Sequence, residues 1–317
     1  MSGDAILVAV DGELAAAWTE AFRKAAGAAR IRVWPHDMGE RNDIAVACVW
    51  RAPHGLLATL PNLKLIVNLG AGADFLLADP SLPDVPIVRA ADPDLSMRVT
   101  EYVVLHTLRY HRRQPLYDAQ QRARVWKEHH QPAASEVNVG IMGLGVIGTE
   151  AARVLARIGF NVAGWSASAK VIDGVETFHG AAGLDRFLAR TEILICLLPL
   201  TDATKGILNR KLFARLKRDG AAGGAFLINA GRGPLQIDTD ILAALDDGTL
   251  AGATLDVFPQ EPLPADSPMW GHPKVTVTPH NAGDILPGLL AAQVMRQIAR
   301  LERGEPLENL VDRRRGY

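Results

Sequence analysis

Residues 138–158 read NVGIMGLGVIGTEAARVLARI, and this stretch decides how the chain folds. The apolar run Asn138–Met142 leads into three glycines with GxGxxG spacing, and a segment with the composition of a helix follows. A glycine loop between a strand and a helix lets backbone N–H groups and the helix N-terminus approach a phosphate closely. The order of strand, glycine loop and helix therefore predicts a dinucleotide-binding unit.

The glycine spacing alone is weak evidence, because 29 of the 317 residues are glycine and a chance match is possible. In its context, Gly143 permits a tight turn, Gly145 admits a pyrophosphate, and Gly148 lets the helix pack closely on the strand. A glycine-rich turn without a ligand is the alternative. The expected cofactor contacts from this loop are Gly143, Leu144, Gly145, Val146, Ile147 and Gly148.

Short apolar runs alternate with helix-length segments along the chain, which is typical of parallel α/β sheets. The length of 317 residues favours two domains. The expected strands of a first series are Ala5–Val10, Ile31–Trp34, Ile44–Val49 and Leu65–Asn68. Those of a second series are Asn138–Met142, Asn161–Trp165, Ile193–Leu198, Ala225–Asn229, Ala253–Val257 and Val275–Thr278. Helices are expected at Glu13–Ala26, Met97–Gln121 and Pro287–Gly304.

Composition excludes several classes of function. Hydrophobic residues make up 48% and charged residues 22% of the chain, as in globular domains. The formal net charge of −1 argues against a nucleic-acid or anionic-membrane partner. Cysteine and histidine do not occur with disulfide or metal-ligand spacing, so no metal is expected. The first apolar run is short and lacks a basic flank, and no run has the length of a membrane span, so we expect a cytoplasmic protein.

The end of the second strand in this series bears on the choice of cofactor. An enzyme that uses NAD usually carries an acid here to bind the ribose hydroxyls. Residues 164–170 read GWSASAK and contain no carboxylate. Ser166, Ser168 and Lys170 could donate hydrogen bonds to a 2′-phosphate, so NADP(H) is the expected cofactor, with NAD(H) possible. A polar loop that discriminates little is the alternative.

Three polar residues follow expected strands, at the sheet edge where ligands bind in open α/β folds. Arg232 lies in LINAGRG, Glu261 in DVFPQEP and His280 in VTPHNAG. A guanidinium can grip a 2-keto acid at its carboxylate and carbonyl, a histidine can supply a proton near neutral pH, and a carboxylate can hold the histidine ring. Singly, these residues could be a surface ion pair, an exposed acid and a structural histidine. Together they predict reduction of a small 2-keto acid.

At this point the chain resembles the D-2-hydroxyacid dehydrogenase family. The motifs GLGVIG, LPLT, INAGRG, LDVFPQEPLP and TPH occur in that family's order, and the resemblance spans nearly the whole chain. Finer features resemble the glyoxylate/hydroxypyruvate reductase A subgroup: VWRAP at 49–53, NLGAGAD at 68–74, the Trp-Ser-x-Ser segment and VDRRRGY at the C-terminus.

The resemblance implies roles for particular residues. Arg232 would bind substrate, Glu261 would orient His280, and His280 would be the acid/base. The backbone at Ala71 and Gly72 would receive the substrate carboxylate, with Trp50 as a wall of the pocket. The further cofactor contacts it implies are Trp165, Ser166, Ala167, Ser168, Lys170, Leu198, Pro199, Leu200, Ala230, Gly231, Arg232, Asp256 and His280.

The resemblance also implies an architecture of two flavodoxin- or Rossmann-like domains, with the cofactor domain inserted into the substrate domain. The expected domains are 1–96 with 283–317 for substrate and 97–282 for NAD(P). A homodimer is expected because family members are usually dimers. The chain departs from the subgroup at Ala167, where an arginine is common. It also departs after His280, where the chain reads Asn-Ala-Gly-Asp and the family usually has Ile-Ala-Ala, so Asn281 and Asp284 are expected to put a polar face near the active site.

Two other functions remain open. One is a dehydrogenase for a bulkier 2-keto or 2-hydroxy acid. The other is a non-catalytic NAD(P)-sensing, co-repressor-like protein on the same fold, since fold does not fix function.

Overall fold

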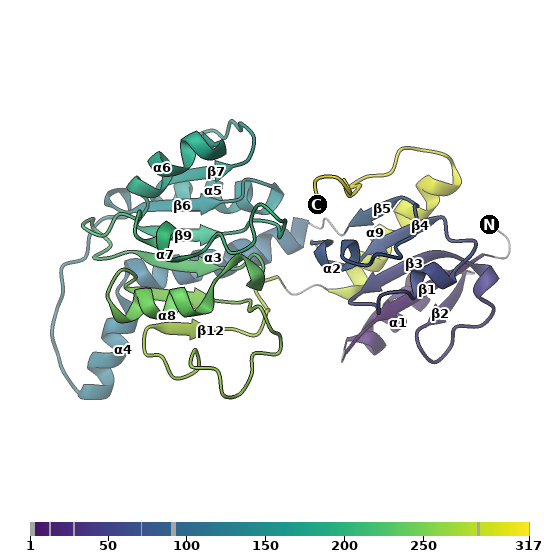
Figure 1. Ribbon diagram of the computed structural model, residues 1–317, viewed down its shortest axis with the longest axis horizontal. Coiled ribbons are helices and arrows are strands. Elements are labelled where there is room, and N and C mark those ends of the chain that lie inside the picture. The colour runs from purple at the N-terminus through teal and green to yellow at the C-terminus, as the bar shows by residue number, and fades with distance from the viewer. Residues whose placement is uncertain are drawn as a thin grey trace. The chain divides into compact units, whose positions relative to one another are not determined.

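The computed structural model describes residues 4–12, 14–27, 29–70, 72–89, 93–283 and 286–316. The chain forms two compact units, Met1–Asp92 with Ile285–Tyr317 and Pro93–Asp284 (Figure 1). Each unit contains one parallel sheet flanked by helices, which confirms the predicted α/β class. The chain leaves the first unit before Pro93, where a helix begins, rather than after residue 96.

The first unit is built on a five-stranded sheet in the order β2-β1-β3-β4-β5. Its strands are β1 Ala5–Val10, β2 Arg30–Val33, β3 Ile44–Trp50, β4 Leu65–Asn68 and β5 Ile87–Arg89. Its helices are α1 Ala15–Ala25, α2 Asp74–Leu77 and α9 Pro287–Glu302. The apolar faces of α1 and α9 bury Phe22, Leu290 and Val294 against the sheet. The C-terminal helix therefore completes the core of the N-terminal sheet.

The second unit is built on a seven-stranded sheet in the order β12-β11-β10-β9-β6-β7-β8. Its strands are β6 Asn138–Met142, β7 Asn161–Ser166, β8 Glu176–His179, β9 Ile193–Cys196, β10 Phe226–Asn229, β11 Gly252–Leu255 and β12 Val275–Val277. Its helices are α3 Pro93–His111, α4 Gln114–Ala123, α5 Val146–Ile158, α6 Gly180–Arg190, α7 Arg210–Phe213 and α8 Asp238–Asp246. Short 3-10 turns lie at Arg41–Asp43, Leu57–Thr59, Ala134–Glu136 and Gly233–Leu235. Helices α6, α7 and α8 bury apolar side chains in one core, and α3 packs on α5 elsewhere in the unit.

The single helix expected over Met97–Gln121 was wrong. Two helices occupy this region, α3 and α4, and Arg113 between them has a left-handed φ of +54°. Pro115 lies in the first turn of α4, where its missing N–H leaves no bond unmade. Inside one continuous helix, the same proline would clash with the carbonyl of His111.

Strands β5 and β8 were not expected from the sequence. Strand β5 has three residues and directly follows Pro86, in a proline-rich segment that indicated a break. Strand β8 forms one edge of its sheet, and its four residues, ETFH, carry no apolar run. Edge strands this short leave little periodic signal.

The order in which successive strands are added across the larger sheet reverses at its middle, although all the strands are parallel. The chain proceeds from β6 to β7 and β8 on one side, then returns to place β9 on the other side of β6. The carboxyl ends of β6 and β9 are therefore the topological switch point of this sheet, the position where ligands bind in open α/β sheets.

In the part of the chain that the structure describes, none of the helices combines the length and apolar character needed to cross a membrane.

A buried carboxylate links the backbone at the amino ends of β6 and β9, opposite the edge described above. Glu192 is fully buried before β9. One of its oxygens accepts hydrogen bonds from the N–H and Nδ2 of Asn138 at 2.9 and 2.7 Å, and the other accepts from the N–H of Ala222 at 2.7 Å. Every partner is a donor, so the site requires two acceptor oxygens.

Replacing Glu192 with glutamine should lower the free energy of unfolding by about 2 kcal/mol, because the amide NH₂ must then face a donor. The measurement is urea denaturation followed by circular dichroism. Glu128→Gln, at an exposed residue of the same unit, is the control and should change stability by less than about 0.5 kcal/mol. Equal losses in the two variants would contradict the prediction.

Candidate active site

The glycine loop has the geometry of a phosphate-binding turn. Gly143 has φ +107°, and a Cβ there would lie 2.6 Å from the carbonyl oxygen of Leu197, so only glycine fits. A Cβ at Gly145 would meet no atom within 4 Å, so the space beside this residue is open. At Gly148 a Cβ would lie 1.8 Å from the carbonyl oxygen of Gly143, so α5 starts in contact with the loop. The open space at the N-terminus of α5 fits a pyrophosphate.

Backbone contacts join the loops that follow successive strands of the second unit. The loop after β6 meets the chain after β9 at Gly143 and Leu197. A Cβ at Gly231, after β10, would lie 3.0 Å from the carbonyl oxygen of Leu198. Gly233, in the same loop, lies against the backbone of Phe258, after β11. The expected cofactor residues Leu198, Pro199, Leu200, Ala230 and Gly231 thus lie on adjoining loops at one sheet edge.

The loop after β7 leaves only part of its polar set exposed. Trp165 is buried and donates its indole N–H to the carbonyl oxygen of Gly180 at 2.9 Å. Ser166 is also buried, and its hydroxyl donates to the carbonyl oxygen of Ser168 at 2.8 Å. The residues Ala167, Ser168 and Lys170 are exposed. In this structure the hydroxyl hydrogen of Ser166 therefore shapes the loop, which leaves Ser168 and Lys170 as its exposed donors.

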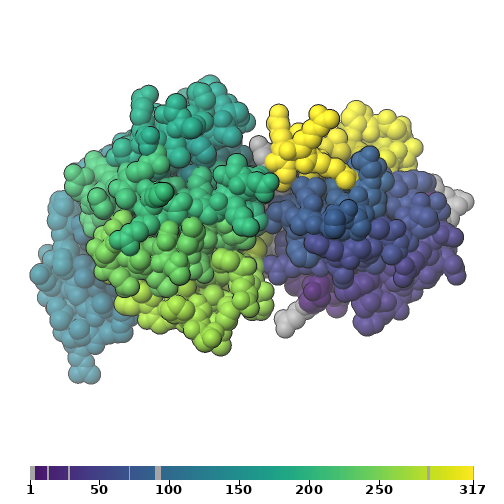
Figure 2. Space-filling view, in the orientation of Figure 1, coloured from purple at the N-terminus to yellow at the C-terminus, as the bar shows by residue number. Residues whose placement is uncertain are grey.

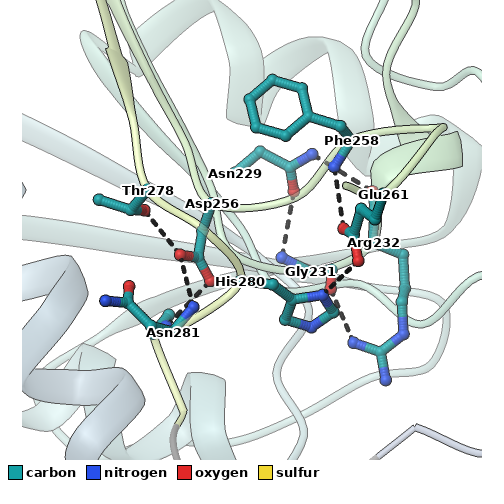
Figure 3. A network of polar contacts seen from close by, with 10 residues as sticks. Asn229, Gly231, Arg232, Asp256, Phe258, Glu261, Thr278, His280 and Asn281 are labelled. Atoms are coloured by element: carbon teal, nitrogen blue, oxygen red, sulfur yellow. Dashed lines mark hydrogen bonds and ion pairs between the residues drawn. The ribbon is translucent and has the colours of Figure 1, made fainter. Parts of the chain in front are cut away.

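A buried amide holds the turn that carries Arg232. Asn229, at the end of β10, has no exposed surface. Its Oδ1 accepts from the N–H of Gly231 at 3.1 Å, and its Nδ2 donates to Oε1 of Gln236 at 2.8 Å. The guanidinium of Arg232 donates from Nη1 to the carbonyl oxygen of Gly231 at 2.8 Å (Figure 3). This hydrogen bond folds the half-buried side chain of Arg232 back onto the backbone of the turn that carries it.

Glu261 and His280 form a direct pair. Oε2 of Glu261 lies 2.7 Å from Nδ1 of His280, with 19% and 30% of the two side chains exposed. Oε1 of Glu261 accepts from the N–H of Phe258 at 3.1 Å, so the carboxylate is anchored to its own loop (Figure 3). A carboxylate at Nδ1 places the proton on that nitrogen and leaves Nε2 for other chemistry.

Asp256 lies at the centre of the loops after β11 and β12. It is buried, and Oδ1 accepts from the hydroxyl of Thr278 at 2.6 Å and from the N–H of Asn281 at 3.0 Å. Oδ2 accepts from the N–H of Ala282 at 3.0 Å. The expected role of Asp256 beside a nicotinamide stays a prediction. The structure shows in addition that this carboxylate binds the segment around His280.

Of the expected substrate residues in the first unit, Trp50 is the last residue of β3, and Gly72 lies in the loop after the neighbouring strand β4. A Cβ at Gly70 would lie 1.9 Å from the ring of Trp50, so the indole covers this glycine. Asn68 donates from Nδ2 to the carbonyl oxygens of Gly70 and Gly72 at 2.7 and 3.0 Å, which shapes the turn. Ala71 lies outside the described residues, as does Asp284.

Sequence reasoning missed the residues that hold these loops. Asn68 and Asn229 are buried amides at the carboxyl ends of apolar strands, and an amide at the end of such a run is the signal that could have identified them. Thr278 gives no such signal, because its partner lies 22 positions away in the chain. Among the residues described, no group of three or more His, Cys, Asp or Glu side chains could hold a metal ion.

Comparison with known proteins assigns the family. Residues 104–282 match the family model for the NAD-binding domain of D-isomer-specific 2-hydroxyacid dehydrogenases. Glyoxylate/hydroxypyruvate reductase A of Yersinia enterocolitica is 40% identical over 306 residues, with 95% of this chain and 96% of the relative covered. The corresponding protein of Salmonella newport is 41% identical over 309 residues, with 96% of each chain covered.

Solved structures agree with this assignment. An NADPH-dependent glyoxylate/hydroxypyruvate reductase from Sinorhizobium meliloti, in complex with NADP and sulfate, has a TM-score of 0.94 and 44% identity, covering 99% of this chain and 100% of that one. A D-isomer-specific 2-hydroxyacid dehydrogenase from Xanthobacter autotrophicus, in complex with NADPH and MES, has a TM-score of 0.94 and 42% identity, with the same coverage. With the glycine loop and the Glu261–His280 pair lying on one parallel sheet, this chain belongs to the D-isomer-specific 2-hydroxyacid dehydrogenase family.

Proposed function

We propose that the protein reduces a small 2-keto acid, glyoxylate or hydroxypyruvate, to the 2-hydroxy acid with NADPH, and that His280 supplies the proton. The observation that carries this proposal is the 2.7 Å pair of Glu261 and His280, on the same sheet edge as an open glycine loop. The names of the relatives in Yersinia, Salmonella and Sinorhizobium support the substrate class.

The reaction requires one hydride and one proton. NADPH, when bound, supplies the hydride to the keto carbon. As negative charge develops on the keto oxygen, His280 donates the proton from Nε2, because Nδ1 faces Glu261. Glu261 keeps the ring in place and holds its proton on Nδ1 through this hydrogen bond. Electrons and protons then balance, since the two-electron reduction of the carbonyl yields the alcohol.

Arg232 is proposed to bind the substrate. A guanidinium has five donors in a planar fork, which suits a carboxylate beside a carbonyl oxygen. In this structure one donor is used on the carbonyl oxygen of Gly231. Arg232 would also stabilise the developing oxyanion by its positive charge. The N–H of Gly72 and the ring of Trp50 are proposed as further substrate contacts, on the strength of the family resemblance alone.

The residues of the second unit fit NADPH. Residues 167–170, directly after β7, include no carboxylate to repel a 2′-phosphate, and Ser168 and Lys170 are exposed there. The related structures from Sinorhizobium and Xanthobacter contain NADP and NADPH respectively. We therefore propose NADP(H) as the preferred cofactor, with NAD(H) as a weaker one.

A second copy of the chain is the proposed partner, in the cytoplasm. Helix α4 has no buried residue in the described part of the chain, and it projects from the second unit (Figure 1). Residues around this helix form the blue region at the left edge of the space-filling view (Figure 2). Trp126 is 96% exposed, and Leu116 and Val125 are also exposed. Apolar surface of this kind favours an isologous dimer contact.

The first test is the proton donor. In His280→Asn, kcat with glyoxylate or hydroxypyruvate and NADPH should fall about 10²- to 10⁴-fold, because general acid catalysis is lost. NADPH binding, followed by fluorescence, should persist. His272→Asn is the matched control. The ring of His272 also pairs with a carboxylate, here through Nε2 to Oδ1 of Asp246 at 3.3 Å, but His272 precedes β12, whereas His280 follows it.

Turnover measured with glyoxylate, hydroxypyruvate and phenylpyruvate separates this function from the two alternatives, a dehydrogenase for bulkier acids and a non-catalytic sensor. Turnover with phenylpyruvate but not with glyoxylate or hydroxypyruvate would indicate a dehydrogenase for bulkier acids. Tight NADPH binding without turnover of any 2-keto acid would indicate a sensor. Full activity of His280→Asn would be compatible with the proposed reduction but would exclude His280 as its proton donor.

The second test concerns the 2′-phosphate. Ala167→Arg places a guanidinium in the exposed loop and should lower the KM for NADPH about tenfold, because one charge-assisted hydrogen bond contributes about 1.4 kcal/mol or more. The KM for NADH should change little, so steady-state kinetics with NADH serve as the internal control. An equal change with both cofactors would place the 2′-phosphate elsewhere.

The third test is the oligomeric state. By sedimentation, the protein should have about twice the chain mass of 34.1 kDa at micromolar concentration. Trp126→Glu places a charge in the exposed apolar surface and should shift the protein to the monomer. Val171→Glu, at a residue that is 99% exposed in the loop between β7 and β8, should leave the mass unchanged. A monomeric wild type would exclude the homodimer.

A further inference from the structure

A chain of side-chain hydrogen bonds links α3 to the segment that carries His280. The hydroxyl of Tyr102, on α3, lies 2.7 Å from Oγ1 of Thr278. Oγ1 of Thr278 lies 2.6 Å from Oδ1 of Asp256. The first contact joins residues 176 positions apart, and all members belong to the second unit.

The direction of the hydrogen bonds follows from the chemistry. Thr278 has one hydroxyl hydrogen, and it must point to the Asp256 carboxylate, which can only accept. The Thr278 oxygen therefore accepts from Tyr102, whose hydroxyl is the donor. Burial raises the pKa of Tyr102 above its ordinary value, and the charge of Asp256 raises it further, so this hydroxyl stays protonated.

Asp256, the last member of this series of hydrogen bonds, holds residues on both sides of His280. The Asp256 carboxylate accepts from the N–H groups of Asn281 and Ala282, each at 3.0 Å (Figure 3). The carbonyl oxygen of Asp256 accepts from the N–H of His280 at 2.8 Å. With Thr278 on the same carboxylate, the residues before and after His280 are fixed to one group.

His280 needs such a support. Its φ is +56°, in the left-handed region that side chains other than glycine rarely adopt. Such a conformation costs about 1 kcal/mol or more and persists only when its surroundings hold it. Glu261 holds the ring of His280 at Nδ1, whereas the direction of the side chain is set by the backbone, which Asp256 holds.

We propose that Tyr102 and Thr278 are positioning residues for the reduction: through Asp256 they hold the segment 278–282 so that Nε2 of His280 meets the keto oxygen. This inference rests on the proposed function, in which His280 is the proton donor. Without the Tyr102 hydroxyl, Thr278 loses its donor and can turn away from Asp256. The segment then relaxes toward ordinary backbone angles, and a displacement of His280 of about 1 Å can cost up to about 100-fold in rate.

The same helix offers a matched control. Tyr110, two turns further along α3, has its hydroxyl 2.7 Å from Oγ1 of Thr254 in β11. This pair has the same chemistry and the same distance as Tyr102 and Thr278, and it is buried. The hydroxyl of Thr254, inside β11, pairs with Tyr110 and not with the segment 278–282, so loss of the Tyr110 hydroxyl should affect stability alone.

The experiment compares Tyr102→Phe with Tyr110→Phe in the full-length protein. Both should lower the melting temperature, since each loses one hydrogen bond, which is part-buried at Tyr102 and buried at Tyr110. Tyr102→Phe alone should lower kcat with glyoxylate, about 10- to 100-fold, with the KM for NADPH unchanged. With NADPH deuterated at the transferred position, its isotope effect on kcat should rise, because the chemical step becomes slower relative to product release.

Thr278 supplies a second series that does not depend on the tyrosine variants. Thr278→Val should reduce kcat as Tyr102→Phe does, and Thr278→Ser should restore it, because serine keeps the hydroxyl. The double variant of Tyr102→Phe and Thr278→Val should be no slower than Thr278→Val, since the two hydroxyls act in one chain.

The outcomes separate this inference from the proposed function. Wild-type turnover that His280→Asn abolishes, together with equal kcat values for Tyr102→Phe and Tyr110→Phe, would overturn the positioning role and leave the function intact. Additive losses in the double variant would also overturn it. Absence of turnover in the wild type would instead overturn the proposed function, and the inference with it.

Discussion

The parallel direction of β6, β9, β10, β11 and β12 is the constraint on which the site depends. Because all these strands end at the same edge, the polar loops that follow them must share one small region. Backbone contacts at Gly143 and Gly233 leave no room for a side chain between those loops, and the contact at Gly231 leaves very little. The sheet therefore sets the distance between a phosphate-binding turn and a histidine about 130 residues further along the chain.

A parallel sheet satisfies the backbone within its strands but not beyond them, so the loops need other partners. Buried side chains provide these partners. Asn229 fixes the Arg232 turn, and Asp256 binds the N–H groups after His280. Glu192 does the same at the opposite end of the sheet. A buried carboxylate is costly to desolvate, and the cost is offset here because each one accepts three hydrogen bonds.

Much of the architecture could be predicted, because its signals are local. An apolar run followed by a glycine loop identifies β6 and α5 within 21 residues, and the motif around His280 identifies its loop. Local signals failed where they were short or were overridden. Pro115 divides a region whose composition favours one helix, and the three residues of β5 are too few to show a period. Ser166 matched the pattern of a phosphate ligand, but its hydroxyl is turned toward Ser168.

The residues that support the site escaped prediction for a different reason. Arg232, Glu261 and His280 are recognised because each stands at a fixed place after a strand, whereas Tyr102 stands in the middle of a helix whose sequence shows no special feature. Its importance depends on a partner 176 positions away, and no local pattern contains that information. The left-handed φ at His280 is a strain of the backbone, and Glu261 contacts only the ring, so the contacts of Asp256 with the backbone hold this conformation. The side chains proposed to do the chemistry are thus identified by motif, whereas those proposed to hold the geometry are identified only by their contacts in the three-dimensional structure.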